Sequence, residues 1–385
     1  VYFGDNNATE FTFSKSGKYL YHLRNFPAYT AFAEDTETGE KVKYFGQAIW
    51  FKETQDGKTL AVYRPENDID LYRVGDWDKP YKTLHYGGGR DDYYNFYSTP
   101  LGGMSFSHDG KKLAVVNHIW GKIILFDAES GAAEILLDGD QFLMYFHSLG
   151  IGLAYVPVYW STDGARITAV YDEPYVNEYR GGVTINVKTG VVEEIPTYIH
   201  CEQNPDNMFF FKLNLEERKL RVYSAASEGL LYTLKDCDWA CFGHGGLLLT
   251  TDEEGKQTTV RQASNGRVVS CFEEQARRSH IYRLWYMTSY DGKYISLSSS
   301  DPDEPYAVIY LAATGEVIQK IPDARHIVWS PADKRFAVEL SGTALNSRLS
   351  YITHMENLEA VMKKTLEKLG GRTLSDEERK KYWLR

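Results

Sequence analysis

Residues 104–131, MSFSHDGKKLAVVNHIWGKIILFDAESG, contain three short apolar runs separated by turn-forming residues. The runs cover 104–106, 113–116 and 123–126, and their spacing does not follow the period of a helix. Between the first two runs, the hydroxyl of Ser107 and the carboxylate of Asp109 can bond the nearby backbone, and Gly110 can take a positive φ. The stretch therefore predicts a meander of antiparallel strands joined by tight turns.

Both kinds of turn in this stretch recur along the chain. The Ser-Asp-Gly type is found again at 14–18, 55–58, 161–164, 289–293 and, without its glycine, at 330–334. The Thr-Gly type, like the turn at 127–131, is found again at 37–39, 188–190, 227–229, 264–266 and 313–315. A repeat of roughly 40 to 55 residues with four strands is typical of a β-propeller blade.

We therefore predict an all-β fold, a β-propeller with eight four-stranded blades or, as the alternative, seven. The last blade, at 326–352, has only three strands of its own in this prediction. Because a closed ring leaves no unpaired strand edge, we expect residues 1–3 to supply its fourth strand.

The opening stretch also carries a family resemblance. MSFSHDGKKLAV at 104–115, followed by IILFDAESG at 123–131, resembles the WD-repeat family. Blades of that family read as a strand, Ser-Pro-Asp-Gly-Lys, a second strand, a third strand ending in Trp-Asp, and a Thr-Gly turn. The resemblance covers nearly the whole chain up to about Tyr351 and implies a propeller. No blade has both the Gly-His and the Trp-Asp signature of the family, and Phe126-Asp127 comes nearest to the latter.

The C-terminal residues change from strand to helix periodicity. Thr353 and Glu356 form a capping box, and an apolar helical face follows, so we expect a propeller at 1–352 and a two-helix tail at 353–385. Residues 371–384, GRTLSDEERKKYWL, resemble the closing motif of bacterial multidomain WD-repeat proteins. That resemblance implies an upstream signal-transduction ATPase, caspase-like or TIR module, and a role for this chain as the sensor of a signalling or defence protein.

Composition narrows the classes of function. The formal net charge is −10, and no dense cluster of Lys and Arg is present, which argues against nucleic-acid binding. No apolar run reaches the ~18 residues of a membrane span, so we expect a cytoplasmic protein without membrane contact. Cys237 and Cys241 with His244 do not have the paired spacing of a structural zinc site. We expect free thiols, no metal and no cofactor.

Three long segments differ from the short, repetitive turns. They lie at 85–103, 138–157 and 171–182, and in a meander propeller they all belong to one face of the ring. Function concentrates in such loops on rigid scaffolds, and tyrosine suits protein recognition. The alternative is that these loops pack on one another as a satellite core. The partner-binding residues that we predict are Arg90, Asp91, Asp92, Tyr93, Tyr94, Tyr97, Tyr145, His147, Asp172, Glu173, Tyr175, Tyr179 and Arg180.

The sequence favours a recognition scaffold over an enzyme. It contains no phosphate-binding Gly-Lys loop, no nucleophile elbow and no His-Glu-x-x-His helix. We therefore predict a non-catalytic module that binds a protein or peptide through the long-loop face. Two alternatives stay open: a propeller hydrolase or lyase with a metal or carboxylate site at the channel mouth, formed for example by Asp91, Asp172 and Glu173, and a structural subunit that docks through its C-terminal helices.

Overall fold

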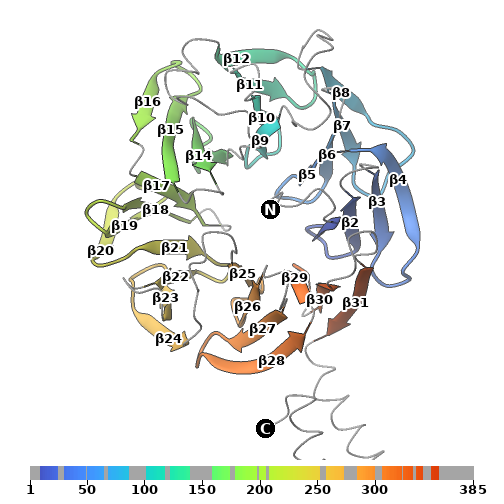
Figure 1. Ribbon diagram of the computed structural model, residues 1–385. Helices are drawn as coiled ribbons and strands as arrows, with labels where there is room; N and C mark the ends of the chain where they lie inside the picture. The colour runs from blue at the N-terminus through green and yellow to red at the C-terminus, as the bar shows by residue number, and fades with distance from the viewer. Residues whose placement is uncertain are drawn as a thin grey trace, which may run out of the picture.

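The structure is a computed structural model in which eight antiparallel sheets follow one another in chain order around a central axis (Figure 1). We call each sheet a blade and number the blades along the chain. The structure describes residues 9–24, 30–48, 50–64, 68–85, 101–117, 122–138, 158–173, 178–196, 199–204, 208–251, 257–272, 284–299, 306–322, 324–332, 335–340 and 348–354. Within these ranges, no helix is long and apolar enough to cross a membrane.

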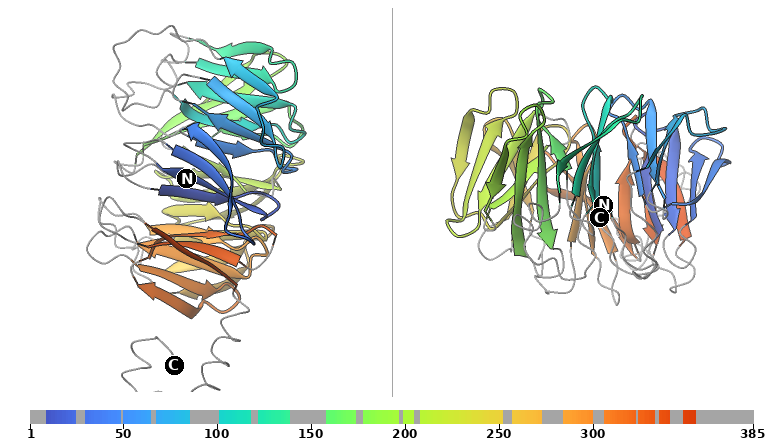
Figure 2. Two further views of the ribbon diagram at one scale, coloured as in Figure 1. Left: turned by 90° about the vertical axis from the view of Figure 1, so that its right-hand side faces the viewer. Right: turned by 90° about the horizontal axis from the view of Figure 1, so that it is seen from above.

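Each blade is built from consecutive strands, and Figure 2 shows these strands running across the thickness of the ring. Blades 1 to 4 comprise β1 (Thr9–Phe13), β2 (Tyr19–Arg24), β3 (Thr30–Asp35), β4 (Lys41–Gln47); β5 (Trp50–Glu53), β6 (Thr59–Tyr63), β7 (Asp68–Arg73), β8 (Lys82–His85); β9 (Leu101–Phe106), β10 (Lys112–Asn117), β11 (Lys122–Asp127), β12 (Ala133–Leu137); β13 (Val158–Trp160), β14 (Arg166–Glu173), β15 (Glu178–Asn186) and β16 (Val192–Ile195).

Blades 5 to 8 continue the same pattern. They comprise β17 (Ile199–Gln203), β18 (Phe209–Asn214), β19 (Lys219–Ser224), β20 (Leu230–Leu234); β21 (Trp239–Phe242), β22 (Leu247–Thr251), β23 (Thr258–Gln262), β24 (Val268–Phe272); β25 (Leu284–Thr288), β26 (Tyr294–Ser299), β27 (Tyr306–Leu311), β28 (Glu316–Pro322); β29 (Ala324–Trp329), β30 (Arg335–Leu340) and β31 (Arg348–His354).

The predicted fold class, an all-β propeller of antiparallel four-stranded blades, is confirmed. Seven of the sheets are complete four-stranded blades, the number given by the alternative count, and the eighth sheet has three strands within the described residues. Residues 1–3, which we expected to complete it, lie outside the described residues. The ring closes through an apolar cluster in which Phe11 and Leu20 of blade 1 meet Val328 and Ala337 of blade 8.

The end of the propeller differs from the prediction. Strand β31 runs to His354 and pairs Thr353 with Phe336, so Thr353 is not the first cap of a helix. The propeller therefore extends two residues beyond the predicted boundary at 352, because the backbone groups of these residues bond the neighbouring strand β30. The predicted tail helices lie outside the described residues.

The tight turns form as their residues predict. In the turn after β9, the Ser107 hydroxyl donates to the Asp109 carboxylate at 2.7 Å and accepts the Lys112 N–H at 3.0 Å, while Gly110 has a φ of +69°. The turns after β1, β5, β13 and β25 repeat this arrangement of a hydroxyl, a polar side chain and a positive-φ glycine. These turns lie at one end of the ring, which we call the tight-turn face.

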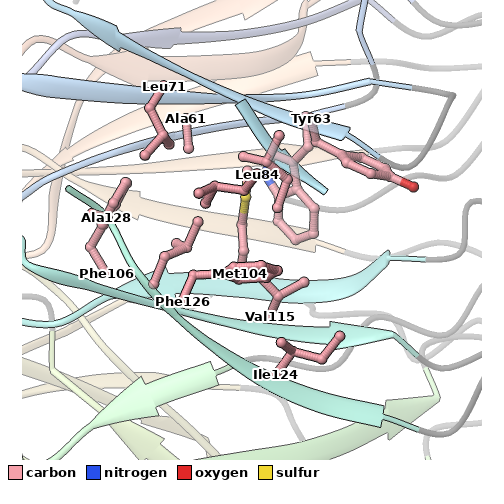
Figure 3. Close-up of a cluster of buried hydrophobic side chains, with 13 residues drawn as sticks. Ala61, Tyr63, Leu71, Leu84, Met104, Phe106, Val115, Ile124, Phe126 and Ala128 are labelled. Carbon is pink, nitrogen blue, oxygen red and sulfur yellow. The ribbon is translucent and has the colours of Figure 1, made fainter. Parts of the chain in front are cut away.

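Most neighbouring blades are joined by an apolar core. Figure 3 shows the cluster between blades 2 and 3, where Leu71 and Tyr63 face Met104 and Phe126, all of them buried. Similar clusters join blades 1 and 2, 3 and 4, 5 and 6, 6 and 7, and 7 and 8. Because each blade is covered on both sides, every residue of the second strands β6 and β22 is buried.

The seam between blades 4 and 5 is different. On its two sides, Thr168 of β14 and Phe210 of β18 are only half-buried, and Lys212 of β18 is exposed. Two contacts across the seam between described residues are polar: the Thr162 hydroxyl donates to the Ala225 carbonyl at 2.9 Å, and Arg166 pairs with Glu228. The blade 4 side carries a surface hollow of about 380 Å³. Among the residues that the structure describes, this seam is therefore more open and more polar than the seams filled by an apolar cluster.

Candidate functional site

Most of the predicted partner-binding residues lie outside the described residues. These are Arg90, Asp91, Asp92, Tyr93, Tyr94, Tyr97, Tyr145, His147 and Tyr175. The strands that flank their segments are described: β8 ends at His85 and β9 begins at Leu101, and β12 ends at Leu137 before β13 begins at Val158. In an antiparallel meander all four of these strand ends lie on the face opposite the tight turns. We call it the long-loop face.

The segment 171–182, predicted to be a loop, is instead a hairpin. Strand β14 continues to Glu173 and β15 begins at Glu178, with Asp172 opposite Tyr179 and Glu173 opposite Glu178. The prediction was wrong because the backbone ladder continues across these residues after a shift in register beyond Val170. The backbones of Asp172, Glu173, Tyr179 and Arg180 therefore belong to strands.

This hairpin is longer than the rest of the blade requires. Strands β14 and β15 have eight and nine residues, whereas β13 and β16 beside them have three and four. Since β14 leaves the tight-turn face at Arg166, its additional residues extend toward the long-loop face. Blade 4 thus holds four of the predicted residues on a hydrogen-bonded ladder rather than on an irregular loop.

A second candidate site, which we did not predict from the sequence, is a cavity of about 430 Å³ along the central axis. The first strands of several blades form its wall. At the tight-turn face, the second residue of several first turns closes the end of the cavity. Channel-facing residues of the first strands are Thr12, Lys52, Ser105 and Tyr159, and the turn residues are Lys15, Gln55, His108, His244 and Tyr290.

Glu53, the last residue of β5, occupies the seam beside this cavity. Its carboxylate accepts the Tyr21 hydroxyl of blade 1 at 3.3 Å and the backbone N–H of Lys15 at 2.5 Å. Burial raises the pKa of the Glu53 carboxyl to about 7, although both hydrogen bonds act in the opposite direction. Near neutral pH this group is therefore divided between its charged and neutral forms.

Lys52 precedes Glu53 and lines the same cavity. Solvent within the channel reaches its side chain, but the surrounding protein lowers the pKa of its amine to about 8, and repulsion by the Lys15 ammonium adds to the shift. At pH 7 the amine is still mostly protonated. Two ammonium groups consequently face one cavity, and among its lining residues that the structure describes Glu53 carries the one carboxylate.

Aromatic and imidazole rings complete the tight-turn end of the cavity. The ring of His244 stacks on Tyr290 of the next blade with a centroid distance of 3.9 Å, and the backbone N–H of His244 donates to the Thr288 hydroxyl at 2.6 Å. Within the described ranges, no group of three or more His, Cys, Asp or Glu side chains is arranged to hold a metal ion. The described cavity thus provides donors and cations suited to binding a ligand.

The sequence does contain a signal for this cavity. In blades 1 to 4 the residue two positions before the first turn lines the cavity, and it is Thr12, Ser105 and Tyr159 in three of them but Lys52 in blade 2. The residue directly before the first turn is Glu53 in blade 2. In five other blades the same position is aromatic: Phe13, Phe106, Trp160, Phe242 and Trp329. Aligning the blades by their turns would have shown both exceptions.

Comparison with known proteins supports the fold and not a family. No protein-family model matches the chain, and no curated protein matches it. Among solved structures, it is similar to the C-terminal WD40 domain of Sif2, with 13% identity, a TM-score of 0.57, and coverage of 88% of this chain and 93% of that one. It is also similar to the dihydro-heme d1 dehydrogenase NirN in complex with DHE, with 12% identity, a TM-score of 0.53, and coverage of 81% and 65%.

A third similar structure is the β-propeller domain of Myceliophteria thermophila Cps50 (Swd1), with 13% identity, a TM-score of 0.48, and coverage of 77% of this chain and 95% of that domain. At these identities the similarity establishes the β-propeller fold alone. That fold is shared by WD40 domains and by a propeller from a dehydrogenase, so it does not by itself choose between recognition and catalysis.

Proposed function

We propose that this chain is a non-catalytic recognition module that binds a protein or peptide partner through its long-loop face. The observation that carries the proposal is the β14–β15 hairpin, which extends toward that face with Asp172, Glu173, Tyr179 and Arg180 in its strands. The WD40 neighbours support a protein-interaction scaffold in general. The other predicted residues follow strands that end on the same face, so a partner spanning blades 3 and 4 could contact both sets.

The hairpin suits recognition for an energetic reason. Binding a partner costs about 0.5–1.5 kcal/mol for each flexible side chain that becomes ordered, and loop ordering adds to this cost. Backbone pairing between Asp172 and Tyr179 fixes the hairpin before a partner arrives. A tyrosine and an arginine on such a ladder provide the residue types that dominate binding energy at protein interfaces.

Selection from a displayed random-peptide library tests this proposal. Wild-type protein is immobilised, enriched peptides are synthesised, and their affinities are measured for the Tyr179→Ala and Arg180→Ala variants. We expect each variant to weaken binding about tenfold or more. The matched control is Tyr44→Ala, which removes a tyrosine that is 63% exposed on the outer strand β4, away from the long-loop face.

Two results would contradict the proposal. Peptides that bind Tyr179→Ala, Arg180→Ala and an Arg90/Tyr93/Tyr94 triple alanine variant as tightly as wild type would place binding elsewhere. Loss of binding in the Tyr44→Ala control would move the site to the outer rim. Circular dichroism of every variant separates lost binding from lost folding.

The sensor role and the bacterial multidomain context rest on the tail resemblance and form a second part of the proposal. An antibody raised against this chain should detect, in an extract of the source cells, a polypeptide larger than the 44.0 kDa of these residues. Fractionation of the same extract tests the proposed cytoplasmic location. A band at 44.0 kDa alone would contradict the fusion to an upstream effector domain.

A further inference from the structure

Two lysine side chains approach one another in the central cavity. Lys52 extends from the first strand of blade 2, and Lys15 from the first turn of blade 1, and both line the same cavity. Both side chains are exposed, so a ligand in the cavity can reach them. Burial lowers the pKa of the Lys52 amine, and repulsion from the Lys15 ammonium adds to that shift.

Neither ammonium group has an ion-pair partner within the part of the chain that the structure describes. The carboxylate beside them, Glu53, bonds the Tyr21 hydroxyl and the Lys15 backbone instead of either ammonium. Two like charges therefore share a confined space, and the Glu53 carboxylate, which is partly neutral near pH 7, offsets them only in part. This arrangement stands out in a chain whose formal net charge is −10, because most of its surface attracts cations.

The rest of the cavity also offers hydrogen-bond donors. Asn204 is 1% exposed and its Oδ1 accepts the backbone N–H groups of Met208 and Phe209 at 2.7 and 2.9 Å. Because both bonds come from donors, the atom that accepts them is the amide oxygen. The Nδ2 group of the same amide has no partner among the described residues. A buried amide without a partner loses the hydrogen bonds that it would make to water, and a ligand or a bound water would restore them.

The size of the cavity is that of a small-molecule site. Ligand pockets usually enclose about 300–1,000 Å³, and this cavity encloses about 430 Å³. Its walls include the aromatic rings of Tyr159 and Tyr290, which supply apolar contact area beside the cations. A long polymer would not fit, but a molecule with one or a few anionic groups would.

We propose that the tight-turn end of the central cavity binds a small anionic molecule through its phosphate or carboxylate groups, with Lys15 and Lys52 as the charge partners. Asn204 lies deeper in the wall and supplies a further donor, directly or through water. This site is separate from the long-loop face, so it does not depend on the proposed partner binding. The propeller would then bind a small molecule in its central cavity in addition to a partner on the long-loop face.

Titration calorimetry with inorganic phosphate, pyrophosphate and citrate, each at the same ionic strength, tests this site. We expect at least one of the three to bind wild type, and Lys52→Ala and Lys15→Ala to weaken it about tenfold or more, since hydrogen bonds to charged groups contribute about 1.5–3 kcal/mol. Lys52→Arg should retain most of the affinity. Preference for citrate over both phosphates would identify a carboxylate ligand, and the reverse a phosphate ligand.

Lys58→Ala is the matched control. It removes a lysine from the same hairpin as Lys52, but the side chain is 78% exposed and its Nζ lies 3.1 Å from Asp56, outside the cavity. If Lys52→Ala fails to fold, Lys52→Met keeps the aliphatic part of the side chain and removes only the charge. The proposal is overturned if wild type binds none of the three anions, or if Lys58→Ala weakens binding as much as Lys52→Ala does.

Discussion

The Tyr21 hydroxyl of blade 1 donates a hydrogen bond of 3.3 Å to the Glu53 carboxylate of blade 2. Tyr21 is 1% exposed, and both residues lie in the seam between blades 1 and 2, which is filled mainly by an apolar cluster. At the position of Glu53, the first strands of five other blades carry a phenylalanine or tryptophan. The seam between blades 1 and 2 therefore contains a titratable group where the repeat would place an aromatic ring.

Glu53 makes the stability of the protein depend on pH. Its folded pKa is about 7 against 4.5 in the unfolded chain, so its contribution is fully present below pH 4.5 and is lost as pH rises through 7. Glutamine stays neutral at both pH values. Between pH 4.5 and pH 8, the unfolding free energy of Glu53→Gln should therefore rise relative to that of wild type by on the order of 2 kcal/mol. Urea unfolding at the two pH values measures the change.

The control for this prediction is Glu40→Gln, which changes an exposed carboxylate at the outer rim. If the stability difference between Glu53→Gln and wild type is the same at pH 4.5 and pH 8, the Glu53 carboxyl has an ordinary pKa and its burial has no energetic consequence.

His22 has the opposite effect on pH dependence. It is 4% exposed and stacks on Phe32 at 4.3 Å, and burial lowers its pKa to about 4, with a smaller contribution from Lys41. The ring is therefore neutral at pH 7, and its 3.6 Å approach to Glu34 is not an ion pair there. Stability is lost as pH falls from 6.5 toward 4, because the unfolded chain takes up the proton first.

Replacement of His22 by a ring that cannot be protonated isolates this effect. When the pH falls from 7 to 4.5, the unfolding free energy of wild type should drop by on the order of 2 kcal/mol more than that of His22→Phe. Urea unfolding at both pH values measures this difference. Since Glu53 and His22 act in opposite directions between pH 4.5 and 6.5, the two substitutions should change the slope of stability against pH in opposite directions, with wild type between them. A steep wild-type profile that neither substitution alters would contradict both assignments.

The open seam between blades 4 and 5 predicts unequal effects for two neighbouring phenylalanines. Phe211 is fully buried between blades 5 and 6, so Phe211→Ala should cost about 3–5 kcal/mol of unfolding free energy. Phe210 faces the seam, where it stacks on Tyr223 at 4.9 Å, and Phe210→Ala should cost only about 1 kcal/mol. Equal losses in thermal or urea unfolding would mean that the seam is packed like the others.

Two glycines in equivalent turns test how closely the blades approach. Gly39 and Gly315 have φ values of +71° and +73°, so alanine at either position costs about 1–2 kcal/mol from backbone strain. A Cβ at Gly39 meets nothing, whereas one at Gly315 would collide with the backbone carbonyl of Cys271 on blade 6. Gly315→Ala should therefore lower the melting temperature clearly more than Gly39→Ala.

The turn chemistry made the strand order predictable from the sequence. Ser107, Asp109 and Gly110 form the contacts that their side chains suggest, and the same is true of the related turns, because these contacts involve residues only a few positions apart. Hence the apolar runs at 113–116 and 123–126, predicted as strands, fall one residue short of β10 and β11 at each end. The predictions from local residue types were wrong at 171–182 and at Thr353, because pairing with the adjacent strand extends the β-ladder there.

The sequence by itself determined that the chain forms a ring of β-meanders, since that follows from contacts within each repeat. Only the tertiary structure brought Lys15, Lys52 and Asn204, which come from three blades, to one cavity, and only it placed Glu53 against Tyr21. The physical reason is that burial and electrostatic environment depend on residues far apart in the chain. The spacing along a single strand cannot specify which blade faces it or how closely.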